Sequence, residues 1–170
     1  MEQNWTRWIF ASLASYLKQT ITAQNWPVLV DQLDDRTDAF MQASDRAEIR
    51  ITGPFFKQPS NGYWLGYTDA NVLLTSRFEG ALKNAYSMLT ISGALEAAMD
   101  KPIPVFNYGG QSGDYVPGGS AKPTWIGALI PRLGQSVRVL NFGQISVTDR
   151  EKQTEVEARY MIELYSQAAV

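Results

Sequence analysis

Residues 154–165 read Thr-Glu-Val-Glu-Ala-Arg-Tyr-Met-Ile-Glu-Leu-Tyr, and this stretch decides the fold class. From Val156 to Leu164 an apolar residue stands at every second position, with Glu or Arg at most of the positions between. Successive side chains of a β-strand point to opposite faces, so this alternation predicts a strand with one buried and one solvated face. Such a strand indicates an antiparallel sheet, because the strands of parallel sheets are buried on both faces.

A second strand is predicted just before this one, at residues 136–147, with Val137 and Val139 on one face. The charged residues 148–153 join the two stretches. Together they predict an antiparallel hairpin at the C-terminal end.

Further strands are predicted in the first half of the chain. Residues 47–52 alternate between apolar and polar side chains, and residues 63–76 are rich in aromatic and β-branched ones. Turn-forming residues lie between and within these strands. We expect turns at Gly53-Pro54 and at residues 59–62, and a bulge or turn at residues 69–71.

Two stretches have apolar residues at three- and four-residue steps, the spacing of one face of an α-helix. They are residues 5–21 and residues 84–99. Asn4 is a suitable N-cap for the first helix, and Gly93 either weakens the second helix or permits close packing on a neighbour. The polar face of the first helix carries too few Lys and Arg for a lipid anchor, so we expect this helix to pack on the sheet.

Two segments remain between these elements. Residues 103–108 predict an extended segment that Pro104 confines to a sheet edge or to a path outside the sheet. Residues 28–45 are compatible with a short strand at Val28, followed by clustered Asp residues that could bind Mg²⁺ or Ca²⁺. The cluster lacks the Gly and the terminal Glu of a calcium loop, which favours a solvated loop.

Residues 109–122 contain five glycines and predict a mobile loop. They lack the Gly-Lys-Ser/Thr and GxGxxG patterns of phosphate-binding loops. The whole chain, residues 1–170, is therefore predicted to be a single α+β domain with this Gly-rich loop. We expect a mainly antiparallel sheet, an N-terminal and a central helix packed on one face, and a C-terminal β-hairpin.

Composition excludes several classes of function. The 170 residues include 15 Lys and Arg against 17 Asp and Glu, so the chain lacks the basic excess of proteins that bind nucleic acid through phosphates. It has neither Cys nor His. This excludes disulfides, Cys/His zinc sites and Ser-His-Asp or Cys-His catalysis. Because the first residues are polar, we expect no signal peptide. Because no apolar run is long enough, we expect no membrane span.

No residue is predicted to be catalytic, to bind a cofactor or to ligate a metal, and we do not expect an enzyme. Without His, a general base near neutral pH would need a strongly shifted carboxylate or Lys. Glu155, Glu157 and Glu163 share one face of the last strand and could act as acid and base. They are more typical of a solvated or subunit-facing surface.

Aromatic residues make up 12% of the chain, and several stand in predicted loops or at the ends of elements. Aromatic residues are enriched in the cores of interfaces, although a normal core also explains part of this content. Combined with the low net charge, their positions favour an assembly of subunits.

This order of elements resembles the tail terminator and neck proteins of tailed bacteriophages. The first helix leads to the strands at residues 47–52 and 63–76, then to the central helix, and the hairpin ends the chain. The likeness is one of pattern over most of the chain. It implies a structural virion protein, found in the tail or neck and assembled in the host cytoplasm. Its homo-oligomeric ring, commonly a hexamer, caps the tail tube and joins tail to head.

The resemblance also implies partners and rival functions. The partners are other copies of the chain, the tail tube and the connector proteins of the head and neck. DNA passes through without specific binding, and no membrane and no cofactor are involved. A head-completion or stopper protein, or another minor neck or baseplate protein, is the alternative. The predicted partner interface is Phe55, Phe56, Tyr63, Gly110, Asp114, Tyr115, Trp125, Arg150 and Lys152.

Overall fold

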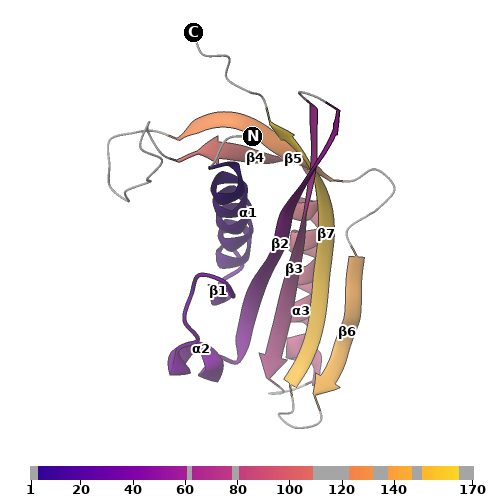
Figure 1. Ribbon diagram of the computed structural model, residues 1–170. Helices are drawn as coiled ribbons and strands as arrows, with labels where there is room; N and C mark the ends of the chain where they lie inside the picture. The colour runs from indigo at the N-terminus through magenta and orange to yellow at the C-terminus, as the bar shows by residue number, and fades with distance from the viewer. Residues whose placement is uncertain are drawn as a thin grey trace.

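The computed structural model describes residues 4–60, 63–77, 81–108, 123–131, 138–146 and 151–164 (Figure 1). The elements follow one another as α1 (Trp5–Thr22), β1 (Val28–Val30), α2 (Asp38–Gln42), β2 (Asp45–Ser60), β3 (Tyr63–Arg77), α3 (Ala81–Met99), β4 (Ile103–Asn107), β5 (Thr124–Pro131), β6 (Arg138–Ser146) and β7 (Glu151–Leu164). This is the α+β class predicted from the sequence.

The described strands form a seven-stranded sheet that forks at β7. Its main order is β1-β2-β3-β7-β5-β4, with β1 parallel to β2 and the other pairs antiparallel. β3 pairs with residues 151–162 along one side of β7. On the other side, residues 151–157 pair with β6 and residues 160–164 pair with β5. The β5–β4 arm therefore leaves β6 and passes over one end of α1 (Figure 1).

The core lies between α1, α3 and one face of this sheet. Ile49, Val72 and Val156 stand side by side on the inner face of three adjacent strands and are fully buried. They pack in one cluster with buried residues of the helices, whose members repeat at helical spacing as predicted. These helical residues are Ile9, Leu13, Leu17 and Ile21 of α1, and Met88, Ile91, Leu95 and Met99 of α3.

Two polar contacts tie the helices to the strands. The Phe106 N–H of β4 donates to the Ser12 hydroxyl oxygen of α1 at 3.0 Å. The Tyr160 hydroxyl of β7 donates to the carbonyl of Met99 at the end of α3, at 2.9 Å. Burial raises the pKa of Tyr160 well above its usual value, so the hydroxyl stays protonated as a donor.

Most of the predicted elements are confirmed. The helices α1 and α3 and the strands β2, β3, β6 and β7 contain most or all of the ranges expected for them. The antiparallel hairpin of β6 and β7 is present, and buried residues alternate with more exposed ones along β7. Pro104 lies in β4, the edge strand of the forked arm, where its missing N–H is tolerated.

The expected turn at Gly53-Pro54 is wrong, because β2 continues through it. The pairing with β3 shifts register between Thr52 and Phe55 and then resumes. Gly53 takes a φ of +98°, a conformation that suits glycine, so the irregularity is absorbed without ending the strand. Residues 55–60, between the two predicted turns and into the second, therefore lie in strand β2. The expected bulge at residues 69–71 is also wrong, since they pair regularly with both neighbours.

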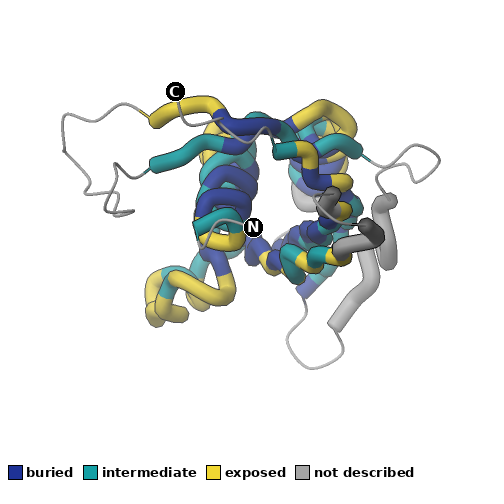
Figure 2. Tube along the Cα trace, turned by 45° about the horizontal axis from the view of Figure 1, so that its top comes forward, coloured by how far each residue is buried: buried dark blue, intermediate teal, exposed yellow. Residues whose placement is uncertain are grey.

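Residues 28–45 and 123–131 form elements that the sequence left open or did not reveal. The first contains the short strand β1 and the short helix α2, where Thr37 accepts a hydrogen bond from the Phe40 N–H. Most of the segment between β1 and β2 is exposed (Figure 2). The second is β5, so Trp125 lies in a strand and not in a loop. The Gly-rich loop at residues 109–122 lies outside the described residues.

Candidate interaction surfaces

One exposed apolar surface lies on the outer face of the sheet, at the end where β2 finishes and β3 begins. Phe55 pairs with Tyr67, which pairs with Met161, and Lys57 pairs with Leu65 in the next row. Leu65 is 50% exposed, Phe55 44% and Met161 40%. We call this surface the sheet patch, and define it as Phe55, Lys57, Leu65, Tyr67, Arg159 and Met161.

The contacts within the sheet patch hold its side chains in place. The rings of Phe55 and Tyr67 lie 5.1 Å apart, and the Arg159 guanidinium lies 5.0 Å from the Tyr67 ring centre. Arg159 also donates from Nε and Nη2 to the two carboxylate oxygens of Asp69, at 2.6 and 2.8 Å. This cation is therefore already paired within the subunit, and the hydrogen bonds and charge of Asp69 raise the pKa of Arg159 above its usual value.

The sheet patch is hollowed. An open hollow of about 360 Å³ lies among Lys57, Leu65, Gly66, Tyr67, Arg159 and Met161. Aromatic and aliphatic side chains form much of its wall, and Lys57 forms no ion pair within the part of the chain described. Such a surface can receive a protruding apolar side chain and one carboxylate.

A second exposed surface follows the outer side of α3. Its residues repeat at three- and four-residue steps, opposite the buried side that packs on the sheet. Tyr86 is 69% exposed and Leu89 is 53% exposed. We call this surface the helix stripe, and define it as Tyr86, Leu89, Thr90, Gly93, Glu96 and Ala97.

The helix stripe carries little charge. Among the 19 residues of α3, Glu96 is the single acid and Lys83 the single base. The Thr90 hydroxyl donates a hydrogen bond to the Tyr86 carbonyl at 2.8 Å. Its proton is therefore already used within the helix and is not left for a hydrogen bond to water. A Cβ built on Gly93 would meet nothing within 4 Å, so the helix is flat and open at that point. A helix whose outer side carries so little charge is typical of one that is covered on both sides.

The opposite end of the sheet's outer face is closed by ion pairs. Arg46 of β2 donates to both carboxylate oxygens of Glu151 of β7, at 2.9 and 2.8 Å, and both side chains are buried. Arg77 of β3, between them, donates to Glu151 at 3.3 Å. Burial raises the pKa of Glu151, but hydrogen bonds and charge from Arg46 and Arg77 outweigh it, so the pKa lies below its usual value.

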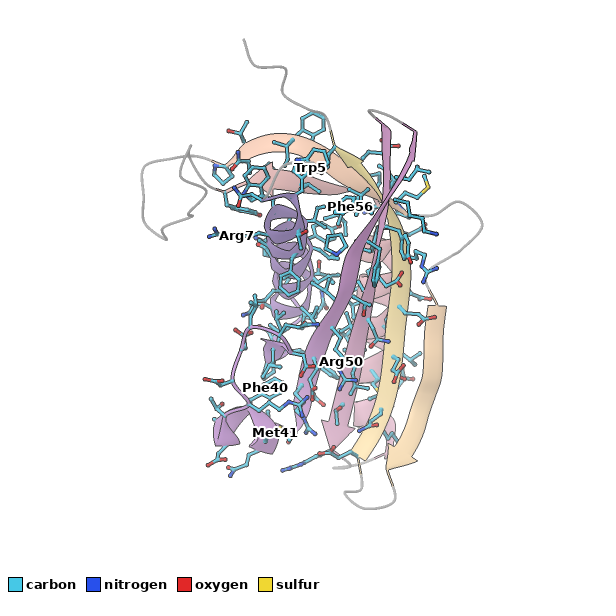
Figure 3. The ribbon with its side chains drawn as sticks, viewed as in Figure 1. Trp5, Arg7, Phe40, Met41, Arg50 and Phe56 are labelled. Atoms are coloured by element: carbon cyan, nitrogen blue, oxygen red, sulfur yellow. The ribbon has the colours of Figure 1, made fainter. Side chains whose placement is uncertain are left out.

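A second charged network lies beside β1. Glu48 is buried on the outer face of β2 and accepts from Arg36 at 2.8 Å. Arg36 also donates to Asp31 at 2.9 Å, and Arg50 approaches Glu48 at 3.5 Å (Figure 3). We call these two networks together the ion-paired end. Within the described ranges, no group of three or more acidic residues could hold a metal ion.

The structure separates the predicted interface residues. Phe55 and Trp125 are exposed strand residues, Trp125 at 52%. Phe56 is partly buried against the core, with its ring centre 6.1 Å from that of Trp5 (Figure 3). It faces inward because its neighbour Phe55 faces outward. Lys152 lies in β7 beside Ser76, and Tyr63 begins β3. The remaining four, which are Gly110, Asp114, Tyr115 and Arg150, lie outside the described residues.

The alternative catalytic carboxylates lie on the outer face of β7, away from the core. Glu155 accepts from the Asn71 amide at 3.4 Å, and Glu157 pairs in register with Asn71. A second open hollow lies beside α1 and is lined in part by Arg7 and Trp8. Among the described residues that line this hollow and that of the sheet patch there is no carboxylate. Within the part of the chain described, no helix is long and apolar enough to cross a membrane.

No family model and no curated protein matches this chain. Among solved structures, a similar one has a TM-score of 0.57 and 13% sequence identity, over 98% of this chain and 99% of the other. Its name states no activity. At this identity the likeness shows the fold alone, an α+β protein with a mixed, mostly antiparallel sheet.

Proposed function

We propose that this chain is a structural virion protein of a tailed bacteriophage, a tail terminator whose ring caps the tail tube and joins the tail to the head. Two lines of argument support the proposal. The order of helices and strands resembles that family. The sheet patch and the helix stripe also expose apolar side chains that a subunit of an assembly would bury.

The observation that carries the proposal is the placement of the two surfaces. The helix stripe faces away from the core on the helical layer, and the sheet patch faces away from it on the sheet. Two different surfaces on opposite sides of one subunit suit a head-to-tail contact, in which one surface of each copy meets the other surface of the next. Such contacts form a ring when the rotation closes.

The remaining properties of the chain are compatible with this role. Its formal net charge of −2 and its paired arginines give DNA passing through a ring little to bind. The partners in this proposal are other copies of the chain, the tail tube and the head connectors. The place of action is the virion.

Native mass tests the proposal. We would measure the purified protein by light scattering over a concentration series, and image the same sample in negative stain. A tail terminator predicts closed rings of defined subunit number, commonly six. Rings of twelve would favour a head-completion or stopper protein. A monomer at every concentration and ionic strength would contradict the ring.

A further inference from the structure

We infer that the helix stripe of one subunit docks onto the sheet patch of the next copy of the same chain. This inference rests on the proposed ring, and it names the two surfaces that would build it. The occupant of each surface is thus a second copy of the chain, because the two surfaces match in charge, in shape and in the spacing of their residues.

The two surfaces are complementary in charge. Glu96 is the one residue of the helix stripe that is charged at neutral pH, and it has no ion-pair partner within the described ranges. Lys57, at the rim of the hollow, likewise has none there. Arg159 is already held by Asp69. Docking would pair Glu96 with Lys57 and bring apolar side chains together around them.

The two surfaces are also complementary in shape. Leu89 projects from the helix stripe, while the sheet patch has an open hollow of about 360 Å³. Gly93, one turn from Leu89, presents no side chain and lets the backbone of another copy approach closely.

The spacing of the residues agrees with this pairing. Glu96 and Leu89 lie two helical turns apart on one side of α3, about 10 Å. Lys57 and Phe55 point to the same face of β2 two residues apart, about 7 Å, and a lysine side chain can cover the remainder. When Glu96 meets Lys57, Leu89 therefore reaches the rings of Phe55 and Tyr67.

A contact between two like surfaces would lose this complementarity. Two helix stripes meeting about a two-fold axis would leave Glu96 against apolar side chains. Two sheet patches meeting in the same way would bring Lys57 and Arg159 of both copies together. Like charges across an interface disfavour association, so the head-to-tail contact is preferred.

Disulfide linking tests the contact directly, because the natural chain has no cysteine. We would prepare Phe55→Cys, Leu89→Cys and the double variant, oxidise each, and separate them on denaturing gels. The replaced side chains are exposed, so unfolding curves should match that of the natural protein. The matched control combines Leu89→Cys with Leu33→Cys, since Leu33 is 66% exposed but lies on neither surface.

The expected result is a ladder of linked oligomers from the double variant that ends at the ring size. The single variants and the control should stay unlinked. Linking by Leu89→Cys alone would show two helix stripes in contact and overturn the inference. If natural rings form but the double variant does not link, the inference fails while the proposed function stands. A ladder with open filaments in place of rings would support the contact and contradict the ring.

Discussion

The two ends of the sheet's outer face differ in how their side chains are satisfied. At the ion-paired end, Arg46, Arg77 and Glu151 bond to one another within the subunit. At the sheet patch, Leu65 and Met161 remain half-exposed beside an open hollow. A buried charge is tolerated only while its partner is present, because removing the partner leaves an unpaired charge away from water. An exposed apolar surface, in contrast, is stabilised when another surface covers it. We therefore expect substitutions at the first end to affect folding and those at the second to affect assembly.

Removing Glu151 should have the largest effect. Glu151→Ala leaves the buried Arg46 without its carboxylate, and breaking a buried pair in this way costs about 3–5 kcal/mol. Urea unfolding followed by circular dichroism would measure the loss. Lys18→Ala is the control, because the Lys18–Asp34 pair is much more exposed and such pairs contribute about 1 kcal/mol or less. Equal losses in the two variants would contradict the importance of the buried pair.

Acid should weaken the same end of the molecule. The pKa of Glu151 is lowered in the folded state, so its contribution is present above the unfolded-state value of about 4.5 and is lost as the pH falls through the folded value. The free energy of unfolding should therefore fall below about pH 5. In Glu151→Gln this fall should be smaller. An identical pH dependence in both proteins would show that other carboxylates dominate.

Leu65→Ser should separate folding from assembly at the sheet patch. Leu65 is half-exposed, so Leu65→Ser should change the protein's free energy of unfolding by about 0.5 kcal/mol or less. Self-association should weaken about tenfold or more, since the variant lacks an apolar side chain that the next copy would cover. Leu33→Ser is the matched control and should leave association unchanged. Equal association of the two variants in sedimentation experiments would remove Leu65 from the interface.

Two glycines give the sharpest comparison of stability. A Cβ on Gly127 would collide with the backbone carbonyl oxygen of Glu163, so Gly127→Ala should lower the free energy of unfolding by about 1–3 kcal/mol. Gly93→Ala meets open space in α3 and should raise it by about 0.5–1 kcal/mol. Yet Gly93→Ala should weaken association, because the flat position on the helix stripe is filled. A gain in both stability and association would contradict close approach at Gly93.

The sequence predicted the fold where one periodic pattern was dominant. The alternation in β7 and the helical spacing of α1 each arise from burial on one face, and both were recognised. β2 was predicted too short because Gly53 and Pro54 usually end strands, and only the partner strand carries the pairing past them. β5 was missed because its short apolar run lacks a regular alternation with polar residues.

The candidate surfaces were harder to predict. Phe55 was predicted as an interface residue, and it is exposed because of its register in β2, which also turns Phe56 inward. The helix stripe left a signal that could have been used, namely α3's single acid and single base. The sheet patch left none, since Lys57, Tyr67 and Met161 come from three strands that meet only in the fold.

Exchanging the charges of Lys57 and Glu96 tests the contact between the two surfaces. We would measure the association constants of Lys57→Glu, Glu96→Lys and the double variant by sedimentation. Each single reversal places like charges together and should weaken association about tenfold or more. The double variant restores opposite charges across the contact and should recover most of the loss. If the loss of association free energy in the double variant equals the sum of the losses in the two single variants, the head-to-tail contact between helix stripe and sheet patch is contradicted.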